Sequence, residues 1–201
     1  MILLEAEQGT QEWLDARLGI PTASNFSRVC TPKTMKRSSS QDGYLDELLA
    51  EWMIGASLDS DITDLMLRGT ELEGDARRLY QFQRDVDVQQ VGLCLTDDRR
   101  VGASPDALVG EDGGLELKSP TAKVQAHYLR TGTVADTYKC QVQGCLWVCE
   151  REWWDVLAFH PEMPHSLIRV ERDDEFIAVL SEYVMEFCDK LEAAKLAVRV
   201  A

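Results

Sequence analysis

Residues 91–119 constrain the fold of this chain more than any other stretch. They hold three short apolar segments, residues 91–96, 101–109 and 115–119, which are separated by acidic and glycine-rich stretches. Such segments are typical of strands joined by tight turns, so we predict three antiparallel strands here. Helical periodicity flanks this region on both sides. The sequence therefore predicts an α/β (α+β) fold in which a central mixed sheet is flanked by helices.

The other elements follow from apolar periodicity and from capping residues. Before the strands, we expect helices over residues 11–18, 23–30, 42–52 and 61–84, the first three capped by Thr10, Thr22 and Asp42. After them, we expect helices at residues 121–130 and 137–150, strands at 153–159 and 166–170, and a final helix from residue 173. The helix over 61–84 is predicted to bury Leu65, Leu72, Ala76, Leu79 and Phe82. The final helix is predicted to bury Phe176, Leu180, Tyr183, Val184, Phe187 and Leu191.

Length and composition favour a single domain. The chain has 201 residues, of which 45% are hydrophobic, and this suits one compact domain over residues 1–201. The sequence has no apolar run long enough for a membrane span, and its first residues lack the features of a signal peptide. We therefore expect a soluble cytoplasmic protein without membrane association.

The six cysteines are expected to be reduced thiols, because their spacing is irregular. Cys140, Cys145 and Cys149 lie close together in a predicted helix, and with Cys30 they would supply four ligands for an iron–sulfur cluster. We favour the alternative that they pack as small buried apolar groups, since Cys140 and Cys145 point to different faces of the helix.

The net charge of −14 argues against a uniformly basic surface for nucleic acid. An acidic exterior is compatible with DNA binding when the basic groups are confined to a groove. Lys33, Lys36 and Arg37 form a basic polar loop. This loop either contacts DNA or is an ordinary solvated loop, and its pattern alone does not separate the two.

Asp106, Glu116 and Lys118 are the candidate catalytic residues. Glu116 and Lys118 are two positions apart in a predicted strand, so they share one face. Asp106, on the preceding strand, joins that face only if the connecting loop has an odd number of residues. A three-residue loop over 112–114 places Asp106, Leu108, Glu116 and Lys118 on one face and the apolar Ala107, Val109, Leu115 and Leu117 on the other. Pro105 cannot donate to a ladder, so strand pairing is expected to bulge or end there.

This set suits hydrolysis of a phosphodiester. The carboxylates of Asp106 and Glu116, with the backbone carbonyl of Leu117, are ligands of the kind that Mg²⁺ prefers, with Mn²⁺ as a substitute. Such an ion polarises a phosphoryl group and acidifies a bound water. Lys118 would orient that water or stabilise the negative charge that develops on phosphate. The alternative is a solvated Glu116–Lys118 ion pair with Asp106 as a turn residue.

Several separated motifs resemble those of the restriction-endonuclease-like nucleases. Asp106 followed by residues 116–118 matches their Pro-Asp and Asp/Glu-x-Lys motif. Within this superfamily the chain is similar to the bacteriophage lambda exonuclease family, which includes viral alkaline exonucleases and recombinases. The segments that carry the resemblance are residues 12–13, 17–19, 22–24, 73–77, 104–106, 115–120, 141–148 and 170–173.

The resemblance implies roles for further residues. Glu73 would reach the metal site from its helix, and Gln141 would border that site. Arg17, Ser24 and Ser104 would hold a terminal 5′-phosphate, since guanidinium and hydroxyl groups suit a phosphate. Without the resemblance, Glu73 and Arg17 are read as solvated charges, Ser24 as a helix cap and Gln141 as a half-exposed helix residue.

The resemblance implies a Mg²⁺-dependent 5′-to-3′ exonuclease that acts on the ends of double-stranded DNA. It would release 5′ mononucleotides and leave a 3′ single strand for recombination by strand annealing. It further implies a homotrimeric ring around the duplex, a single-strand annealing protein as partner, and a phage or prophage origin in a bacterial host. The alternatives are an endonuclease or repair nuclease with the same site, and a catalytically inactive DNA-end-binding protein, which would have no reason to keep the complete set.

Overall fold

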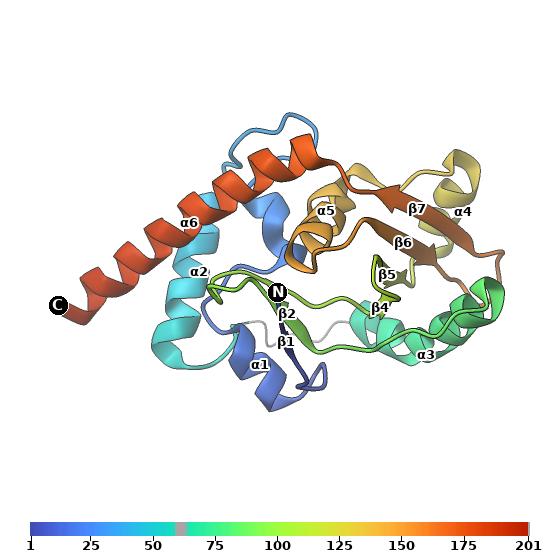
Figure 1. Ribbon diagram of the computed structural model, residues 1–201, viewed down its shortest axis with the longest axis horizontal. Coiled ribbons are helices and arrows are strands. Elements are labelled where there is room, and N and C mark those ends of the chain that lie inside the picture. Colours follow the sequence, from blue (N-terminus) through green and yellow to red (C-terminus); the bar gives the residue numbers. More distant parts are fainter. Residues whose placement is uncertain (59–63, 201) are drawn as a thin grey trace.

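The computed structural model describes the backbone of residues 1–58 and 64–200 and the side chains of residues 1–58 and 72–199. Helices surround two sheets, and the long α6 extends away from them to one tip of the molecule (Figure 1). The helices are α1 (Gln11–Arg17), α2 (Gln41–Ile54), α3 (Asp64–Arg84), α4 (Ala122–Thr131), α5 (Lys139–Val148) and α6 (Asp174–Val200), with the 3₁₀ helices η1 (Ala23–Arg28) and η2 (Asp136–Tyr138).

The strands form two sheets instead of the one that we predicted. The strands are β1 (Ile2–Leu4), β2 (Leu93–Leu95), β3 (Gly102–Ala103), β4 (Ala107–Val109), β5 (Gly113–Lys118), β6 (Trp153–Ala158) and β7 (Ser166–Glu171). The smaller sheet has the order β1-β2-β3 and the larger one the order β4-β5-β6-β7. In the larger sheet β5 and β6 are parallel and the other neighbours antiparallel. The predicted mixed sheet flanked by helices is confirmed in this larger sheet.

The segment 101–109 does not form the single strand that was predicted. β3 ends at Ala103 in one sheet and β4 begins at Ala107 in the other, so residues 104–106 carry the chain between the two sheets. Pro105 has no backbone N–H for a ladder, so strand pairing ends there. Asp106 therefore lies at the junction of the sheets, directly before β4.

The loop between β4 and β5 differs from the predicted loop in position but not in length. Val109 pairs with Gly113, so the loop consists of residues 110–112 instead of 112–114. Gly110 has a φ of 59°, which suits glycine in a turn. Gly113 and Gly114 lie inside β5, where the rings of Trp153 and Trp154 on the neighbouring strand cover them. A Cβ atom on either glycine would lie 2.2 Å from the nearest ring atom.

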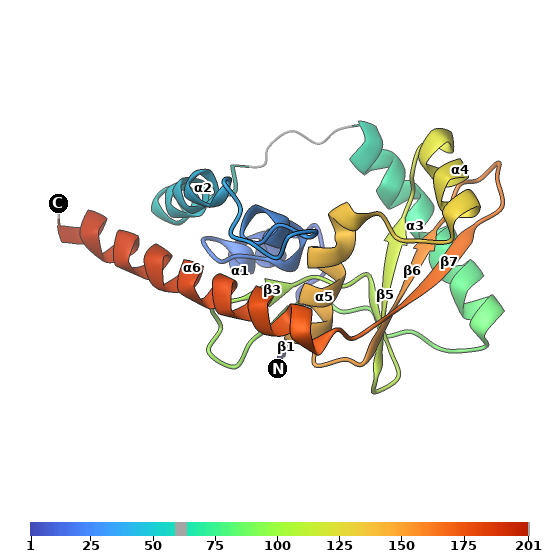
Figure 2. The ribbon, with the colours of Figure 1, turned by 90° about the horizontal axis from the view of Figure 1, so that it is seen from above.

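Helices cover both faces of the larger sheet, with α3 on one side and α5 on the other (Figure 2). On the α3 side, Ala107, Leu115 and Leu157 pack with Ala76 and Tyr80. On the other side, the buried side chains of β4 and β6 join the main core with α5 and α6; they are Leu108, Trp154 and Val156. Each strand of the sheet thus alternates between two helical layers.

One of the three predicted helix caps is confirmed. The Thr10 hydroxyl accepts a hydrogen bond from the backbone N–H of Trp13 at the start of α1. Thr22 precedes the short 3₁₀ helix η1 instead of an α-helix, and its side chain makes no cap hydrogen bond. α2 begins at Gln41, so Asp42 lies in its first turn. An acidic residue still favours a helix in that position.

The predicted buried face is confirmed for most of its residues in α6 but only in part in α3. In α6, Phe176, Leu180, Val184, Phe187 and Leu191 are buried, as predicted, and Tyr183 is half-buried. In α3, Ala76 is buried and Leu72 and Leu79 are half-buried, but Phe82 is 86% exposed and Tyr80 is buried in its place. The side chain of Leu65 lies outside the described residues.

All six cysteines are free and buried. The Cys140 thiol donates to the backbone carbonyl of Cys30 at 3.1 Å. Within the described side chains, no three His, Cys, Asp or Glu residues are grouped so that they could hold a metal. All six belong to the main hydrophobic core, where they pack among apolar side chains. None of the described helices is long and apolar enough to cross a membrane.

A buried ion pair on the α3 side of the sheet is part of the core. Asp155 of β6 is fully buried. Arg169 of β7 donates to both of its carboxylate oxygens, at 2.8 and 2.9 Å. The Tyr80 hydroxyl donates to Oδ2 at 2.8 Å. Both oxygens of this carboxylate are thus satisfied by hydrogen bonds, as a buried charge requires.

We expect Tyr80→Phe to lower the free energy of unfolding by about 1.5–3 kcal/mol, because it removes a buried hydrogen bond to a charged group. Tyr183→Phe is the matched control, since no hydrogen bond of the Tyr183 hydroxyl occurs among the described residues, and it should change stability little. Urea unfolding of the two variants measures the difference. Equal stabilities would contradict a stabilising role for the Tyr80–Asp155 bond.

Candidate active site

Asp106 and Glu116 lie opposite each other at the junction of the two sheets. β4 and β5 pair with Ala107 opposite Leu115, and the same register, continued by one residue, sets Asp106 against Glu116. The Asp106 Oδ2 atom accepts a hydrogen bond of 2.5 Å from the backbone N–H of Leu117. This bond holds the Asp106 carboxylate beside β5. The predicted sharing of one face by Asp106, Glu116 and Lys118 is confirmed, although the loop that produces it is shifted.

Glu116 is a buried carboxylate with one satisfied and one unsatisfied oxygen. Its residue surface is 5% exposed. Oε1 accepts from Lys118 Nζ at 2.6 Å and from Gln141 Nε2 at 2.7 Å. Oε2 is buried and has no hydrogen-bond partner. An unsatisfied buried carboxylate oxygen is costly, so this atom marks a position that a cation would stabilise.

Lys118 lies between Glu116 and two residues from the helical layer. Its ammonium donates to Gln141 Oε1 at 3.3 Å and lies 4.6 Å from the ring centroid of Tyr138. Burial alone would lower the pKa of Lys118, but the carboxylates of Glu116 and Asp106 outweigh it and raise that pKa. The positive charge of Lys118 is thus stabilised by the two carboxylates and suits it to stabilise negative charge on a phosphate.

The negative charges of the Asp106 and Glu116 carboxylates repel each other. Burial, followed by the charge of Glu116, raises the pKa of Asp106 well above its usual range, and Glu73 adds to this effect. Two adjacent carboxylates stay ionised together more easily when a cation lies between them. Asp155, in the same sheet, needs no such ion because Arg169 and Tyr80 occupy both of its oxygens.

The donor set at this point fits a divalent metal ion. Asp106 and Glu116 offer carboxylate oxygens, one of them without any partner, and Leu117 between Glu116 and Lys118 offers a backbone carbonyl. Oxygen ligands of this kind suit Mg²⁺ or Mn²⁺ and leave coordination positions for water and phosphate. The set is small, since no third acidic side chain joins Asp106 and Glu116 in a cluster within the described side chains.

Glu73 and Gln141 take different places around this set. Gln141, on α5, bonds to both Glu116 and Lys118 and so lies within the cluster. Glu73, on α3, is half-exposed and forms an ion pair with Arg77 one helical turn later. Its charge acts on Asp106, but within the described side chains it forms no hydrogen bond to the cluster.

Arg17, Ser24 and Ser104 are linked through Trp13 and Thr22, to which the sequence analysis gave no role in phosphate binding. Arg17 Nη2 lies 3.5 Å from the Thr22 hydroxyl, and the Ser24 hydroxyl lies 3.3 Å from the same oxygen. The Arg17 guanidinium stacks on Trp13, 4.0 Å from its ring centroid. Trp13 Nε1 in turn donates to Ser104 Oγ at 3.2 Å. These contacts group the predicted phosphate ligands around the Trp13 ring and the Thr22 hydroxyl.

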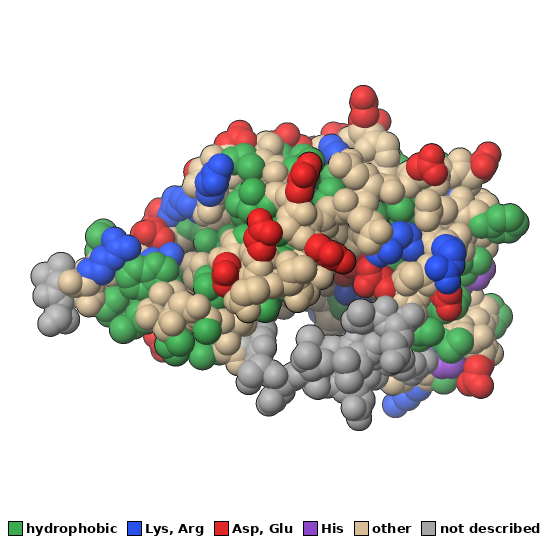
Figure 3. Space-filling view, turned by 90° about the horizontal axis from the view of Figure 1, so that it is seen from below, with side chains coloured by type: hydrophobic (Ala, Val, Ile, Leu, Met, Phe, Trp, Pro, Cys, Tyr) green, Lys and Arg blue, Asp and Glu red, His purple; other side chains and the backbone are tan. Residues whose placement is uncertain are grey.

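In the basic loop, two of the three basic residues form ion pairs with acidic side chains of other elements. Lys33 pairs with Asp136 at 3.0 Å, and Arg37 pairs with Glu186 of α6. Lys36 is exposed. On the face shown in Figure 3, Lys and Arg side chains stand singly among acidic and apolar ones in the part of the chain that is described.

The fold is that of solved exonucleases. The crystal structure of an alkaline exonuclease (LHK-Exo) from Laribacter hongkongensis matches with a TM-score of 0.85 and 33% sequence identity, over 94% of this chain and 96% of that chain. LHK-Exo in complex with dAMP matches with the same TM-score of 0.85 and 33% identity, over 96% of this chain and 100% of that chain. A phage related exonuclease from Haemophilus somnus 129PT matches at a TM-score of 0.66 and 15% identity, over 87% of this chain and 96% of that chain, and shows the fold alone.

The mixed α/β fold and the carboxylate–lysine cluster at its sheet junction thus define an alkaline exonuclease-like protein. The pattern of the YqaJ-like viral recombinase domain matches residues 12–152. The chain belongs to this family, as the resemblance to lambda exonuclease-like proteins predicted. No curated protein sequence matches the chain.

Proposed function

We propose that this protein is a Mg²⁺-dependent 5′-to-3′ exonuclease of double-stranded DNA ends, with residues 1–201 acting as one nuclease domain. The observation that carries the proposal is the cluster of Asp106, Glu116, Lys118 and Gln141, in which one buried Glu116 oxygen lacks a partner. The 33% identity to an alkaline exonuclease over most of both chains supports the same activity.

Each residue of the cluster has a defined task in this proposal. Asp106, Glu116 and the Leu117 carbonyl hold the metal ion, which when bound polarises the phosphoryl group and acidifies a water molecule. Lys118 orients the attacking water and stabilises the negative charge that develops on the phosphate. Gln141 fixes both Glu116 and Lys118 through its amide. Glu73 supports a second ion or a water at the edge of the cluster.

The terminal phosphate of the substrate is held by a separate group of side chains. Arg17 supplies positive charge, and Ser24 and Ser104 supply hydroxyl donors. Trp13 and Thr22 keep these three residues together through the stacking and hydrogen bonds described above. A 5′-phosphate bound there would set the distance from the DNA end to the scissile bond.

We further propose a homotrimeric ring around the duplex and a single-strand annealing protein that coats the exposed 3′ strand. A ring is consistent with the net charge of −14, since only the surface that faces DNA needs to be positive. Within the basic loop, the exposed Lys36 is the residue that we expect to contact DNA, because Lys33 and Arg37 form ion pairs within the protein.

The proposal is tested by digestion of one plasmid in its covalently closed and linear forms in the presence of Mg²⁺. We expect the linear form alone to be degraded, with 5′ mononucleotides as product and no reaction in EDTA. Cleavage of the closed circle would favour an endonuclease. Binding of the linear form without cleavage would favour an inactive end-binding protein.

Arg17→Ala is expected to weaken the preference for 5′-phosphorylated ends. Loss of one guanidinium–phosphate interaction should raise KM for 5′-phosphorylated duplex roughly tenfold to a hundredfold, because charge-assisted hydrogen bonds are strong. KM for 5′-hydroxyl duplex should change little. Arg78→Ala, which removes an exposed arginine of α3, is the control. An equal loss on both kinds of end would remove the proposed role of Arg17.

A further inference from the structure

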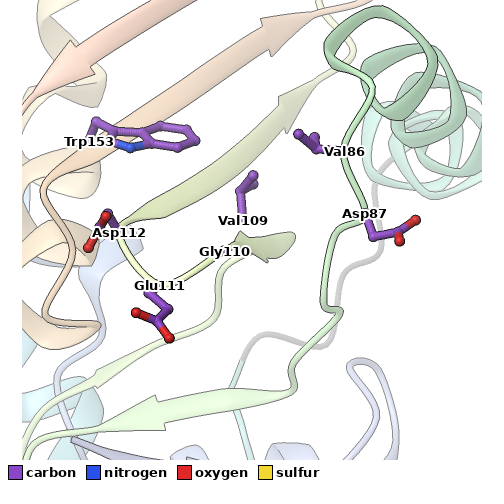
Figure 4. A pocket seen from close by; sticks show the side chains of 7 residues that line it. All are labelled: Val86, Asp87, Val109, Gly110, Glu111, Asp112 and Trp153. Atoms are coloured by element: carbon purple, nitrogen blue, oxygen red, sulfur yellow. The ribbon is translucent and has the colours of Figure 1, made fainter.

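An open apolar hollow lies at the β4–β5 loop, away from the catalytic cluster. It has a volume of about 410 Å³ and is lined by Val86, Asp87, Val109, Gly110, Glu111, Asp112 and Trp153. Figure 4 shows the side chains of Trp153, Val109 and Val86 around the same space, bordered by Glu111, Asp112 and Asp87, whose carboxylates point outward from its edges. The hollow thus combines an apolar floor with an acidic rim.

The floor of this hollow is held in place by the sheet. The Trp153 ring lies over Gly113, where a Cβ atom would be 2.2 Å from it. The guanidinium of Arg169 stacks on the same ring, 3.6 Å from its centroid, and is itself fixed by the buried Asp155. A tryptophan fixed in this way offers the exposed part of its ring as an apolar contact at a low cost in side-chain entropy.

The rim carries three acidic side chains whose charge is not balanced by the hollow itself. Asp87, Glu111 and Asp112 are exposed, and within the described side chains no ion pair joins them to a cation. None of the seven lining residues is basic. The hollow therefore repels a phosphate backbone and attracts positive charge.

The hollow and the catalytic cluster lie on opposite faces of the sheet. Val109, Gly113 and Trp153 are paired across three neighbouring strands, so their side chains lie on the face that α3 covers. Glu116 is three residues along β5 and points to the opposite face, at roughly 10 Å along the strand. A molecule bound in the hollow would leave the catalytic cluster open to DNA.

We propose that this hollow docks a peptide segment of a partner protein, in which an apolar side chain is flanked by Lys or Arg residues. The apolar side chain packs on Trp153 and Val109, and the flanking cations face Asp87, Glu111 and Asp112. Charge complementarity selects this occupant over nucleic acid. It also disfavours a second copy of this chain, whose net charge is −14.

The test is fluorescence anisotropy of short labelled peptides with the full chain. One peptide has two central leucines flanked by lysines, a second has glutamate in place of lysine, and a third has alanine in place of leucine. We expect saturable binding of the first peptide. The other two peptides should bind roughly tenfold more weakly, since charge and apolar contact each contribute. Failure of the first peptide to bind more tightly than the glutamate peptide would overturn the proposal.

Paired charge reversals locate the binding. Asp87→Lys with Glu111→Lys should weaken the lysine peptide roughly tenfold. The control, Asp42→Lys with Asp46→Lys, changes the same charge on the exposed side of α2 and should leave the affinity unchanged. Equal weakening in both would show attraction to the acidic surface in general and would overturn the proposal. Digestion of linear DNA should be equal in the two variants, because the hollow does not take part in catalysis.

Discussion

Lys118→Ala is expected to reduce cleavage of linear duplex by a factor on the order of 10²–10³, the size of effect that follows loss of a group that stabilises transition-state charge. The reason is geometric: the Lys118 side chain lies within hydrogen-bond distance of Glu116 and Gln141, at the centre of the cluster. DNA binding should be largely retained, because the phosphate ligands Arg17, Ser24 and Ser104 are elsewhere. Single-turnover cleavage and anisotropy of a labelled duplex measure the two quantities.

Two further variants separate the charge from the fold. Lys123→Ala removes an exposed lysine at the start of α4 and should leave the rate unchanged. Lys118→Arg retains the positive charge and should keep more activity than Lys118→Ala. Circular dichroism and the unfolding temperature show whether Lys118→Ala is folded. If a folded Lys118→Ala cleaved at the rate of the native protein, the role assigned to this lysine would be wrong.

Gly114→Ala is expected to destabilise the protein by about 3 kcal/mol, toward the upper end of the range for overpacked cores. Trp154 is fully buried, and its ring would lie 2.2 Å from the new Cβ atom. For a protein of this size the loss corresponds to a decrease of roughly 6–12 °C in the unfolding temperature. Calorimetry or circular dichroism measures the shift.

Gly43→Ala is the matched control for this prediction. Gly43 lies in α2, and a Cβ atom there would contact nothing within 4 Å. Alanine favours a helix over glycine, so this variant should gain up to about 1 kcal/mol. The same substitution is thus expected to have opposite signs at the two positions. A Gly114→Ala protein as stable as the native one would contradict close packing of β5 against Trp154.

Gly113 and Gly114 explain why the loop between β4 and β5 lies at a different position from the one predicted. A glycine pair after an acidic residue is the usual signal of a turn. Here the pair is glycine because two tryptophans from β6 cover it, and β6 is about forty residues away in the sequence. The face shared by Asp106 and Glu116 was still predicted correctly, since both loops have three residues.

Elements with distant partners were the hardest to predict. β1 has three residues, and Leu3 pairs with Cys94, so no local signal marks it. The split of residues 101–109 between two sheets also depends on contacts far along the chain. By contrast, the periodicity of α6 extends over many turns and predicted its buried face.

The candidate site was predictable where its residues are neighbours in sequence. The shared face of Glu116 and Lys118 follows from strand periodicity. Gln141 was identified only through the resemblance, because it lies on α5 and reaches Glu116 and Lys118 of β5 through tertiary hydrogen bonds. Trp13 was missed as a partner of Arg17, although the two are four positions apart in a helix and so share one side of it. Thr22 was read as a cap because its contacts to Arg17 and Ser24 are tertiary.

The central claim is that Asp106 and Glu116 hold one divalent ion between two strands. Titration of the native protein with Mn²⁺ in a calorimeter tests it without any DNA substrate. We expect saturable binding by the native protein and its loss in Glu116→Gln, which keeps the size of the side chain and removes its charge. Mn²⁺ binding of equal affinity by both proteins would contradict the assignment of this metal site.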